Sequence, residues 1–179
     1  YHAIVSTGTK ALVFAEMCHG CGGCPRVCPR QAIREVPRRI GMVERRQAGD
    51  IALVTGRLDV GSVLAPPLIR EVKRRLDPSL PAVIDAPPGT SCPVVTAVRG
   101  ADFVLLVTEP TPFGLHDLQL AVDTLRELAQ PFAVVLNRAG AGDDRVHRYC
   151  REAGIAIMME IADDRRIAEA YSRGRLVFD

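Results

Sequence analysis

Four cysteines in one short segment restrict the fold of this chain more than any other feature of its sequence. They stand in the run Cys18-His-Gly-Cys21-Gly-Gly-Cys24-Pro-Arg-Val-Cys28-Pro29, with the spacing C-x2-C-x2-C-x3-C-P. Glycine allows the backbone to turn back tightly, so that one loop can bring several thiolates together. Soft thiolate ligands at this density select iron–sulfur clusters or zinc over hard cations. We therefore expect Cys18, Cys21, Cys24 and Cys28 to bind a metal centre.

The spacing favours a [4Fe-4S] cluster over the alternatives. It is the run that holds such clusters in bacterial-type ferredoxins, where the fourth cysteine binds the second of two clusters. A structural zinc site usually has two C-x-x-C pairs separated by a longer span, and thiols this close suit a metal better than disulfides. The sequence has one such run, so a complete site needs another ligand. Cys92 is open to three interpretations: a buried small side chain, a supplementary cluster ligand, or a feature of unknown purpose.

The composition is typical of a soluble globular protein, with 47% hydrophobic residues, 25% charged residues and a net charge of +2. No apolar run approaches the roughly 20 residues of a membrane span, so we expect no membrane interaction. A thiol-rich site without a signal peptide predicts a cytoplasmic location.

Arginines are concentrated around and after the cysteine run. They form either a solvated face beside an anionic cluster or a docking patch for an acidic redox partner. No aromatic residues are interleaved for base stacking, which disfavours nucleic acid as a partner. The arginines concerned are Arg26, Arg30, Arg34, Arg38, Arg39, Arg45 and Arg46.

Residues 1–62 are predicted to form a partial ferredoxin-like iron–sulfur lobe and its connection to the rest of the chain. Apolar residues at 11–14 indicate a strand, and residues 31–36 are expected to form the short turn that closes the lobe. Alternating apolar residues and glycines at 40–60 indicate an antiparallel excursion.

Residues 63–179 are predicted to form an α/β domain, an open and mostly parallel sheet flanked by helices. Nearly continuous apolar runs indicate parallel strands buried on both faces. The four expected strands are 82–84, 103–107, 132–136 and 156–159. Helical periodicity and capping residues indicate helices over 65–76, over 115–129, and from an N-cap at Asp163 to Gly174.

Polar residues follow the expected strands. Asp85 ends the first strand and leads into a stiff Pro-Pro pair and Gly89, while Glu109 and Asn137 follow the next two strands. The carboxyl ends of parallel strands form the rim where such sheets bind ligands. Asp85 is suited to hold Mg²⁺ and Gly89 to offer a backbone N–H to a phosphate. The structural alternative is a tight turn with Asp85 in solvent.

Three motifs carry a resemblance to a known family. They are Asp-x-Pro-Pro-Gly-Thr-Ser-Cys-Pro at 85–93, Val-Thr-Glu-Pro-Thr-Pro-Phe-Gly-Leu-His-Asp-Leu at 107–118, and Asn-Arg at 137–138. In this order they resemble the MinD/ParA-type P-loop ATPases, and most of all the nitrogenase iron protein-like branch with an inserted [4Fe-4S] ferredoxin domain. The resemblance covers the chain from Cys18 onward.

The resemblance implies a protein that binds ATP and Mg²⁺ in a nucleotide-sandwich homodimer. Asp85 would be the Walker B acid, residues 88–90 would form switch II, and Asn137 would contact the adenine. The implied nucleotide-binding residues are Pro88, Gly89, Thr90, Asn137 and Arg138.

The sequence departs from this family in its N-terminal part. Gly8-Thr9-Lys10 does not fit the phosphate-binding pattern G-x4-G-K-[S/T], because Thr9 precedes the lysine and Ala11 follows it. The first ferredoxin cysteine run is also missing. We therefore expect that the chain lacks the Walker A part and, alone, neither binds ATP tightly nor hydrolyses it.

The leading hypothesis is an iron–sulfur protein of the MinD-like ATPase family. In the full-length protein, nucleotide binding would drive electron or cluster transfer to a redox or cluster-accepting protein. One alternative is a ferredoxin-type electron-transfer or scaffold module that needs no nucleotide. Another is a positioning ATPase of the ParA kind, in which the cysteines would act as a sensor.

Overall fold

The computed structural model describes residues 2–177, so residues 1, 178 and 179, at which the two expected domains begin and end, lie outside the described part. The chain divides into two compact units, Tyr1–Ile84 and Asp85–Asp179. The sequence places the boundary earlier, after residue 62. Among the helices described, none has both the length and the apolar character to cross a bilayer.

The first unit begins with a small lobe. Strands β1 (Ile4–Ser6) and β2 (Ala11–Val13) pair antiparallel, which confirms the strand expected at 11–14. The 3-10 helix η1 (Ala15–Met17) and the short helix α1 (Gly23–Val27) follow. Residues 31–40, which include the expected closing turn, form no helix, strand or turn.

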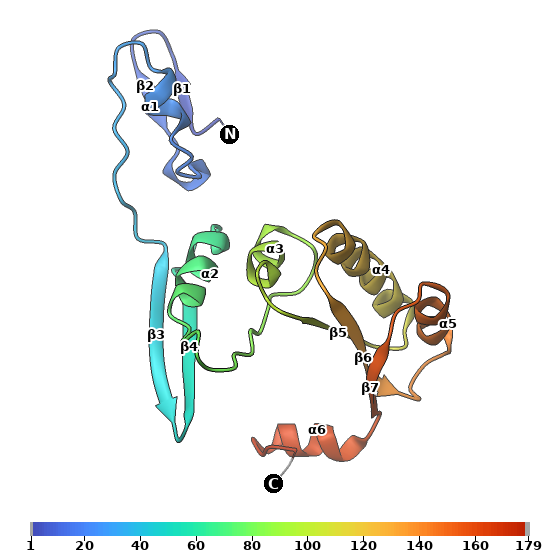
Figure 1. The fold of residues 1–179 in the computed structure, drawn as a ribbon. Coiled ribbons are helices and arrows are strands. Elements are labelled where there is room, and N and C mark those ends of the chain that lie inside the picture. Colours follow the sequence, from blue (N-terminus) through green and yellow to red (C-terminus); the bar gives the residue numbers. More distant parts are fainter. Residues whose placement is uncertain (1, 178–179) are drawn as a thin grey trace. The chain divides into compact units, whose positions relative to one another are not determined.

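The rest of the first unit is a hairpin with a helix on one face (Figure 1). Strands β3 (Gly41–Ala48) and β4 (Ile51–Leu58) pair antiparallel, as the pattern at 40–60 predicts. Helix α2 (Ala65–Arg74) contacts both strands. A Cβ atom on Gly56 would lie 2.8 Å from Val72, so the missing side chain allows the helix to lie close to the hairpin.

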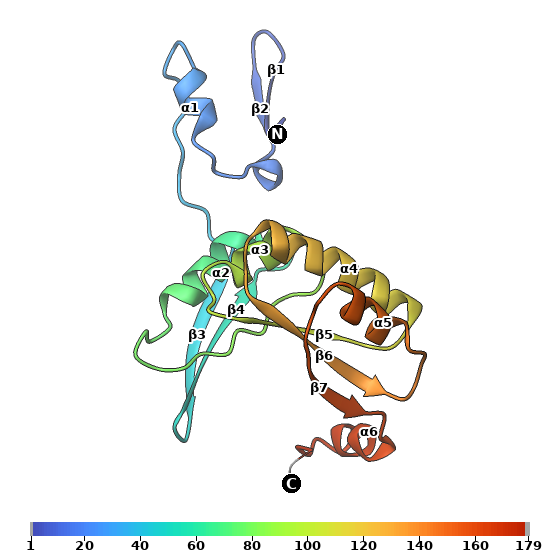
Figure 2. The same cartoon turned by 45° about the vertical axis from the view of Figure 1, so that its right-hand side comes forward.

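The second unit contains a three-stranded parallel sheet in the order β5-β6-β7, with α4 and α5 on the same side of it (Figure 2). The parallel pairing confirms the mixed α/β class and three of the expected strands. The strands are β5 (Val104–Thr108), β6 (Phe132–Ala139) and β7 (Ile157–Ala162). The helices are α3 (Cys92–Val98), α4 (Pro112–Glu127), α5 (Arg145–Glu152) and α6 (Arg165–Ser172).

The core of this unit lies between the sheet and the two helices α4 and α5. Its buried residues are Leu118, Val122, Val134, Leu136, Val146 and Cys150. The opposite face is open at the outer strand β5, where Leu105 is 52% and Val107 66% exposed. The expectation that every strand is buried on both faces is therefore wrong for β5, because α4 and α5 cover one face only.

Two further sequence predictions are wrong. Residues 82–84 form no strand, and the side chain of Val83 is fully exposed. An apolar segment becomes a strand only if another strand offers it hydrogen bonds, and no described strand pairs with this one. The N-cap of α6 is Asp164, whose carboxylate accepts a hydrogen bond from the Arg166 N–H, and not Asp163.

Candidate functional site

The four clustered cysteines lie on one loop of the first unit. Cys18 follows η1, Cys24 lies within α1, and Cys28 directly follows α1 as its C-cap. Cys18 and Cys21 are exposed, whereas Cys24 and Cys28 are half-buried. No three of these thiols form a group that could hold a metal, alone or with other side chains of residues 2–177. The structure therefore places the predicted ligands on one loop without gathering their sulfur atoms.

Two glycines let the backbone of the cysteine loop turn tightly. Gly20 and Gly22 have φ angles of +60° and +71°, in the left-handed region that glycine adopts without strain. The Gly22 N–H donates a hydrogen bond of 3.0 Å to the Glu35 carboxylate, which holds the loop to the segment after α1. Sequence reasoning missed Glu35, because nothing in the spacing connects it with the cysteines.

Among the four clustered cysteines, Cys28 has a sulfur atom that accepts a backbone hydrogen bond, which favours its thiolate form. The backbone N–H of Ala32 donates a hydrogen bond of 3.4 Å to its Sγ atom. This bond, with a weaker one from the Arg30 N–H, lowers the pKa of Cys28 below the ordinary value of a thiol. The thiolate is the form that binds metals, and hydrogen bonds to sulfur are a feature of iron–sulfur sites.

The thiol donors and the hydrogen bond to sulfur are of the kind found at [4Fe-4S] sites, although the structure does not bring the sulfur atoms together. Cys92 and Cys150 belong to the second unit. Cys92 is exposed at the first turn of α3, so the interpretation of Cys92 as a buried side chain is wrong. Cys150 is buried in the core.

The segment with the predicted Walker B acid is an exposed loop. Asp85, Pro88, Gly89 and Thr90 all lie in solvent before α3. Gly89 has a φ of +90° and no atom within 4 Å of the position where a Cβ would lie. Within the described residues, Asp85 shares no metal-binding group with other side chains, so the residues present do not form a magnesium site.

Three charged side chains meet at the carboxyl ends of the strands in the second unit. The guanidinium of Arg138, at the end of β6, lies 3.1 Å from Asp163 after β7 and 3.5 Å from Glu109 after β5. These contacts raise the pKa of Arg138, chiefly through the hydrogen bond to Asp163. Arg138 is thus brought to the rim as predicted, but its charge is balanced by two carboxylates.

Asn137 is half-buried beside this cluster. Its carboxamide makes no hydrogen bond to any of the residues that the structure describes, so its donors and acceptor are available to a ligand. The two carboxylates that hold Arg138 share a simple sequence signal, since each directly follows a strand. Asp163 was missed as a partner because its position also suits a helix cap.

Backbone packing fixes the loops at the rim. The Thr111 hydroxyl accepts a hydrogen bond from the Gly114 N–H and caps α4, while Thr108 Oγ1 donates to the Gly114 carbonyl. A Cβ on Gly114 would lie 2.3 Å from the Glu109 carbonyl oxygen, and one on Gly142 would overlap the Pro110 carbonyl oxygen. Several residues of the motif at 107–118 therefore stabilise the turn that leads from β5 into α4.

Comparisons with known proteins give relatives without an assigned function. The chain is 30% identical to uncharacterized protein MJ0579 of Methanocaldococcus jannaschii over 96% of its own length and 60% of that protein. It is also 30% identical to uncharacterized protein MJ0578 of the same organism, over 69% of its length and 54% of that protein. The chain thus spans between half and two thirds of these curated relatives. No family model and no solved structure matches it.

Proposed function

We propose that this chain is the cluster-binding part of an iron–sulfur protein of the MinD-like ATPase type. The observation that carries the proposal is the C-x2-C-x2-C-x3-C-P run on a loop with left-handed glycines and an N–H bonded to the Cys28 sulfur. Cys18, Cys21, Cys24 and Cys28 are the proposed ligands. When bound, a [4Fe-4S] cluster supplies one-electron redox chemistry at this loop.

The residues of the loop have separate roles in this proposal. The cysteine thiolates hold the metal, and the Ala32 N–H stabilises negative charge on the Cys28 sulfur. Glu35 restrains the loop at Gly22. In the whole protein, nucleotide binding would be coupled to electron or cluster transfer to a partner protein, with Asn137 contacting the base and residues 88–90 the phosphates.

A second candidate is an electron-transfer or scaffold module that needs no nucleotide. It is favoured by the rim cluster, because Glu109 and Asp163 neutralise the cation that a phosphate would need. The two candidates differ in one measurable property. A cluster whose reduction potential changes when ATP is added supports coupling, and a potential that ATP leaves unchanged supports the second candidate.

The first experiment is the iron and acid-labile sulfide content of protein purified without oxygen. We expect about four of each per chain, and loss of both in Cys24→Ser. Cys150→Ala is the matched control, because it removes a thiol that is buried far from solvent in the second unit. A lower content in Cys92→Ser would identify the further ligand. Zinc in place of iron, or no metal at all, would contradict the proposal.

The resemblance to ATPases is tested on the same protein. Without a complete phosphate site we expect no measurable ATP hydrolysis by this chain. Turnover that disappears in Asp85→Ala would show that the chain holds a working nucleotide site, against our expectation.

A further inference from the structure

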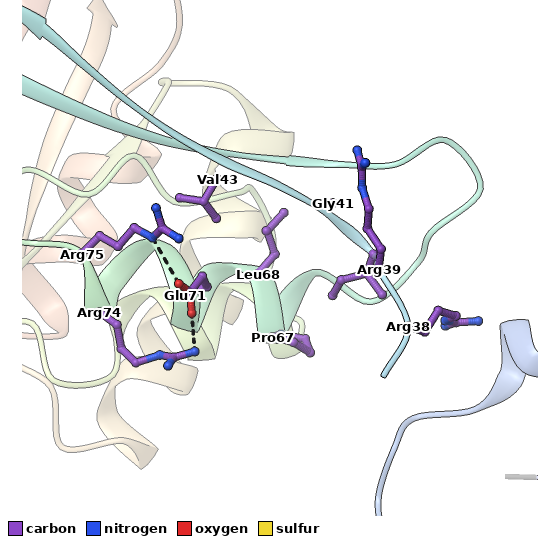
Figure 3. Close-up of a pocket in the computed structure, with 10 residues that line it drawn as sticks. Arg38, Arg39, Gly41, Val43, Pro67, Leu68, Glu71, Arg74 and Arg75 are labelled. Carbon is purple, nitrogen blue, oxygen red and sulfur yellow. Dashed lines mark hydrogen bonds and ion pairs between the residues drawn. The ribbon is translucent and has the colours of Figure 1, made fainter. Parts of the chain in front are cut away.

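A groove of about 370 Å³ lies between the start of β3 and helix α2 in the first unit. Figure 3 shows the side chains around it. Four arginines line the groove together with a single carboxylate, that of Glu71. Two of them, Arg38 and Arg39, end the segment that leaves the cysteine loop, and the other two, Arg74 and Arg75, end α2. Segments distant in the sequence thus place like charges around one opening.

The floor of the groove is apolar. Val43 of β3 and Leu68 of α2 line it, and Leu68 is only 8% exposed. Leu68 packs closely against the hairpin, because its side chain lies 3.1 Å from the position where a Cβ on Gly56 would stand. An apolar side chain of a partner would find here a surface that water solvates poorly.

Intramolecular contacts orient the arginine side chains but leave some of their N–H donors without a partner among the described residues. Glu71 pairs with both Arg74 and Arg75, and Arg39 pairs with Asp59 at 3.1 Å. The fourth arginine, Arg38, donates a hydrogen bond to the carbonyl oxygen of Ala15. A guanidinium has five N–H donors, and each of these pairs engages only some of them. The side chains of Arg39 and Arg74 remain 65% and 75% exposed. The groove therefore keeps an excess of positive charge and free donors at its rim.

We propose that this groove is the docking site for an acidic segment of a partner protein that carries apolar side chains among its carboxylates. Arginine forks bind carboxylates through paired hydrogen bonds, and Val43 and Leu68 receive the apolar side chain. No aromatic residue lines the groove, so it lacks the stacking platform of single-stranded nucleic acid sites. An isolated phosphate would leave the apolar floor without a function.

The groove is connected directly to the cysteine loop. The linking segment, residues 29–40, ends at the arginines that line the groove. A protein bound in the groove therefore lies no farther from the proposed cluster ligands than residues 29–40 can span. That the partner receives electrons or a cluster rests on the proposed function, whereas the docking site itself does not.

The test is a binding titration of the whole chain with a short fluorescent peptide of alternating Glu and Leu residues. We expect saturable binding that weakens with salt, as charged contacts do. The double variant Arg74→Gln, Arg75→Gln should weaken binding at least about tenfold, because arginines often carry interface affinity. The control Arg46→Gln removes a paired arginine of the same hairpin outside the groove and should change affinity less than about twofold.

Three outcomes would overturn the docking site. These are no binding of the peptide, equal losses in Arg46→Gln and in the double variant, or displacement of the peptide by inorganic phosphate or an oligonucleotide at similar concentrations. A peptide of Glu and Ser should bind more weakly than the Glu–Leu peptide, and equal affinity would contradict a role for the apolar floor. The titration needs no metal, so its failure is distinguishable from a failure to find iron and sulfide.

Discussion

The two units of this chain differ in how they bury apolar side chains. In the second unit, Val122, Val134 and Leu136 are completely buried between a parallel sheet and two helices. In the first unit, only Ala3 and Leu68 among the described residues are buried, and each remains 8% exposed. Both units come from one sequence of ordinary hydrophobic content, so composition alone does not distinguish them.

This difference shows that the two units need different sources of stability. A lobe without a sizeable core usually depends on disulfides, a metal or an added partner surface. The cysteines of this chain are all free thiols, so disulfides do not supply that stability. Under the proposed function, the metal cluster would fulfil this role in the first unit, whereas the second unit relies on its hydrophobic core.

The largest expected effect comes from breaking the core of the second unit. Leu136→Ala leaves a cavity in the middle of β6 and should lower the free energy of unfolding by about 2–5 kcal/mol. Hydrogen exchange read residue by residue should show faster exchange in β5, β6 and β7 and little change in β3 and β4. The control is Leu105→Ala on the exposed face, expected to cost about 0.5 kcal/mol or less. Equal changes in both units would mean that they unfold together.

A smaller effect is expected from the corresponding change in the first unit. Leu68→Ala truncates the buried side chain of α2 and should cost about 2 kcal/mol, near the lower end of the range for such changes. The loss should appear as faster exchange in β3, β4 and α2 only. Leu80→Ala, at an exposed position of the same unit, is the control. A loss as large as that of Leu136→Ala would remove the contrast between the units.

Much of the second unit could be predicted because its local signals agree with its packing. The apolar runs of β5, β6 and β7 lie where the sequence places them, and the helix expected at 115–129 is α4, which begins earlier, at Pro112. The strand expected at 82–84 failed because pairing depends on a neighbour that the segment itself does not specify. The apolar residues of a segment indicate that it can be buried, but they do not specify which element covers it or pairs with it.

The sequence names candidate site residues but does not specify how they are arranged. Spacing identified Cys18, Cys21, Cys24 and Cys28, but the positions of their sulfur atoms depend on backbone turns far more than on residue type. Arg138 does lie at the carboxyl ends of the strands, the edge at which such sheets bind ligands. Its contacts with Glu109 and Asp163 follow from the register of three strands, which only the folded sheet defines.

The smallest expected effect is a dependence of stability on pH that differs between the units. Burial raises the pKa of the Cys150 thiol, while backbone N–H groups lower that of Cys28. A raised pKa means that Cys150 stabilises the fold fully below the unfolded value of about 8.5, and that this contribution is lost as the pH rises. For Cys28 the sign is opposite, so its contribution is lost as the pH falls through its lowered pKa.

Thermal unfolding of metal-free protein followed in the second unit should therefore show a Tm that falls above about pH 8.5. Cys150→Ala should flatten this fall, whereas Cys92→Ala should leave it unchanged, because Cys92 is exposed in the folded chain. Burial also raises the pKa of neighbouring Tyr149, so the comparison is best made below about pH 9.5, before an unfolded tyrosine ionises. If the Tm of both cysteine variants falls equally as the pH rises, burial of the Cys150 thiol is not the cause of the lower stability of the second unit at alkaline pH. The contrast in pKa between the Cys150 thiol of one unit and the Cys28 thiol of the other would then have to rest on Cys28 alone.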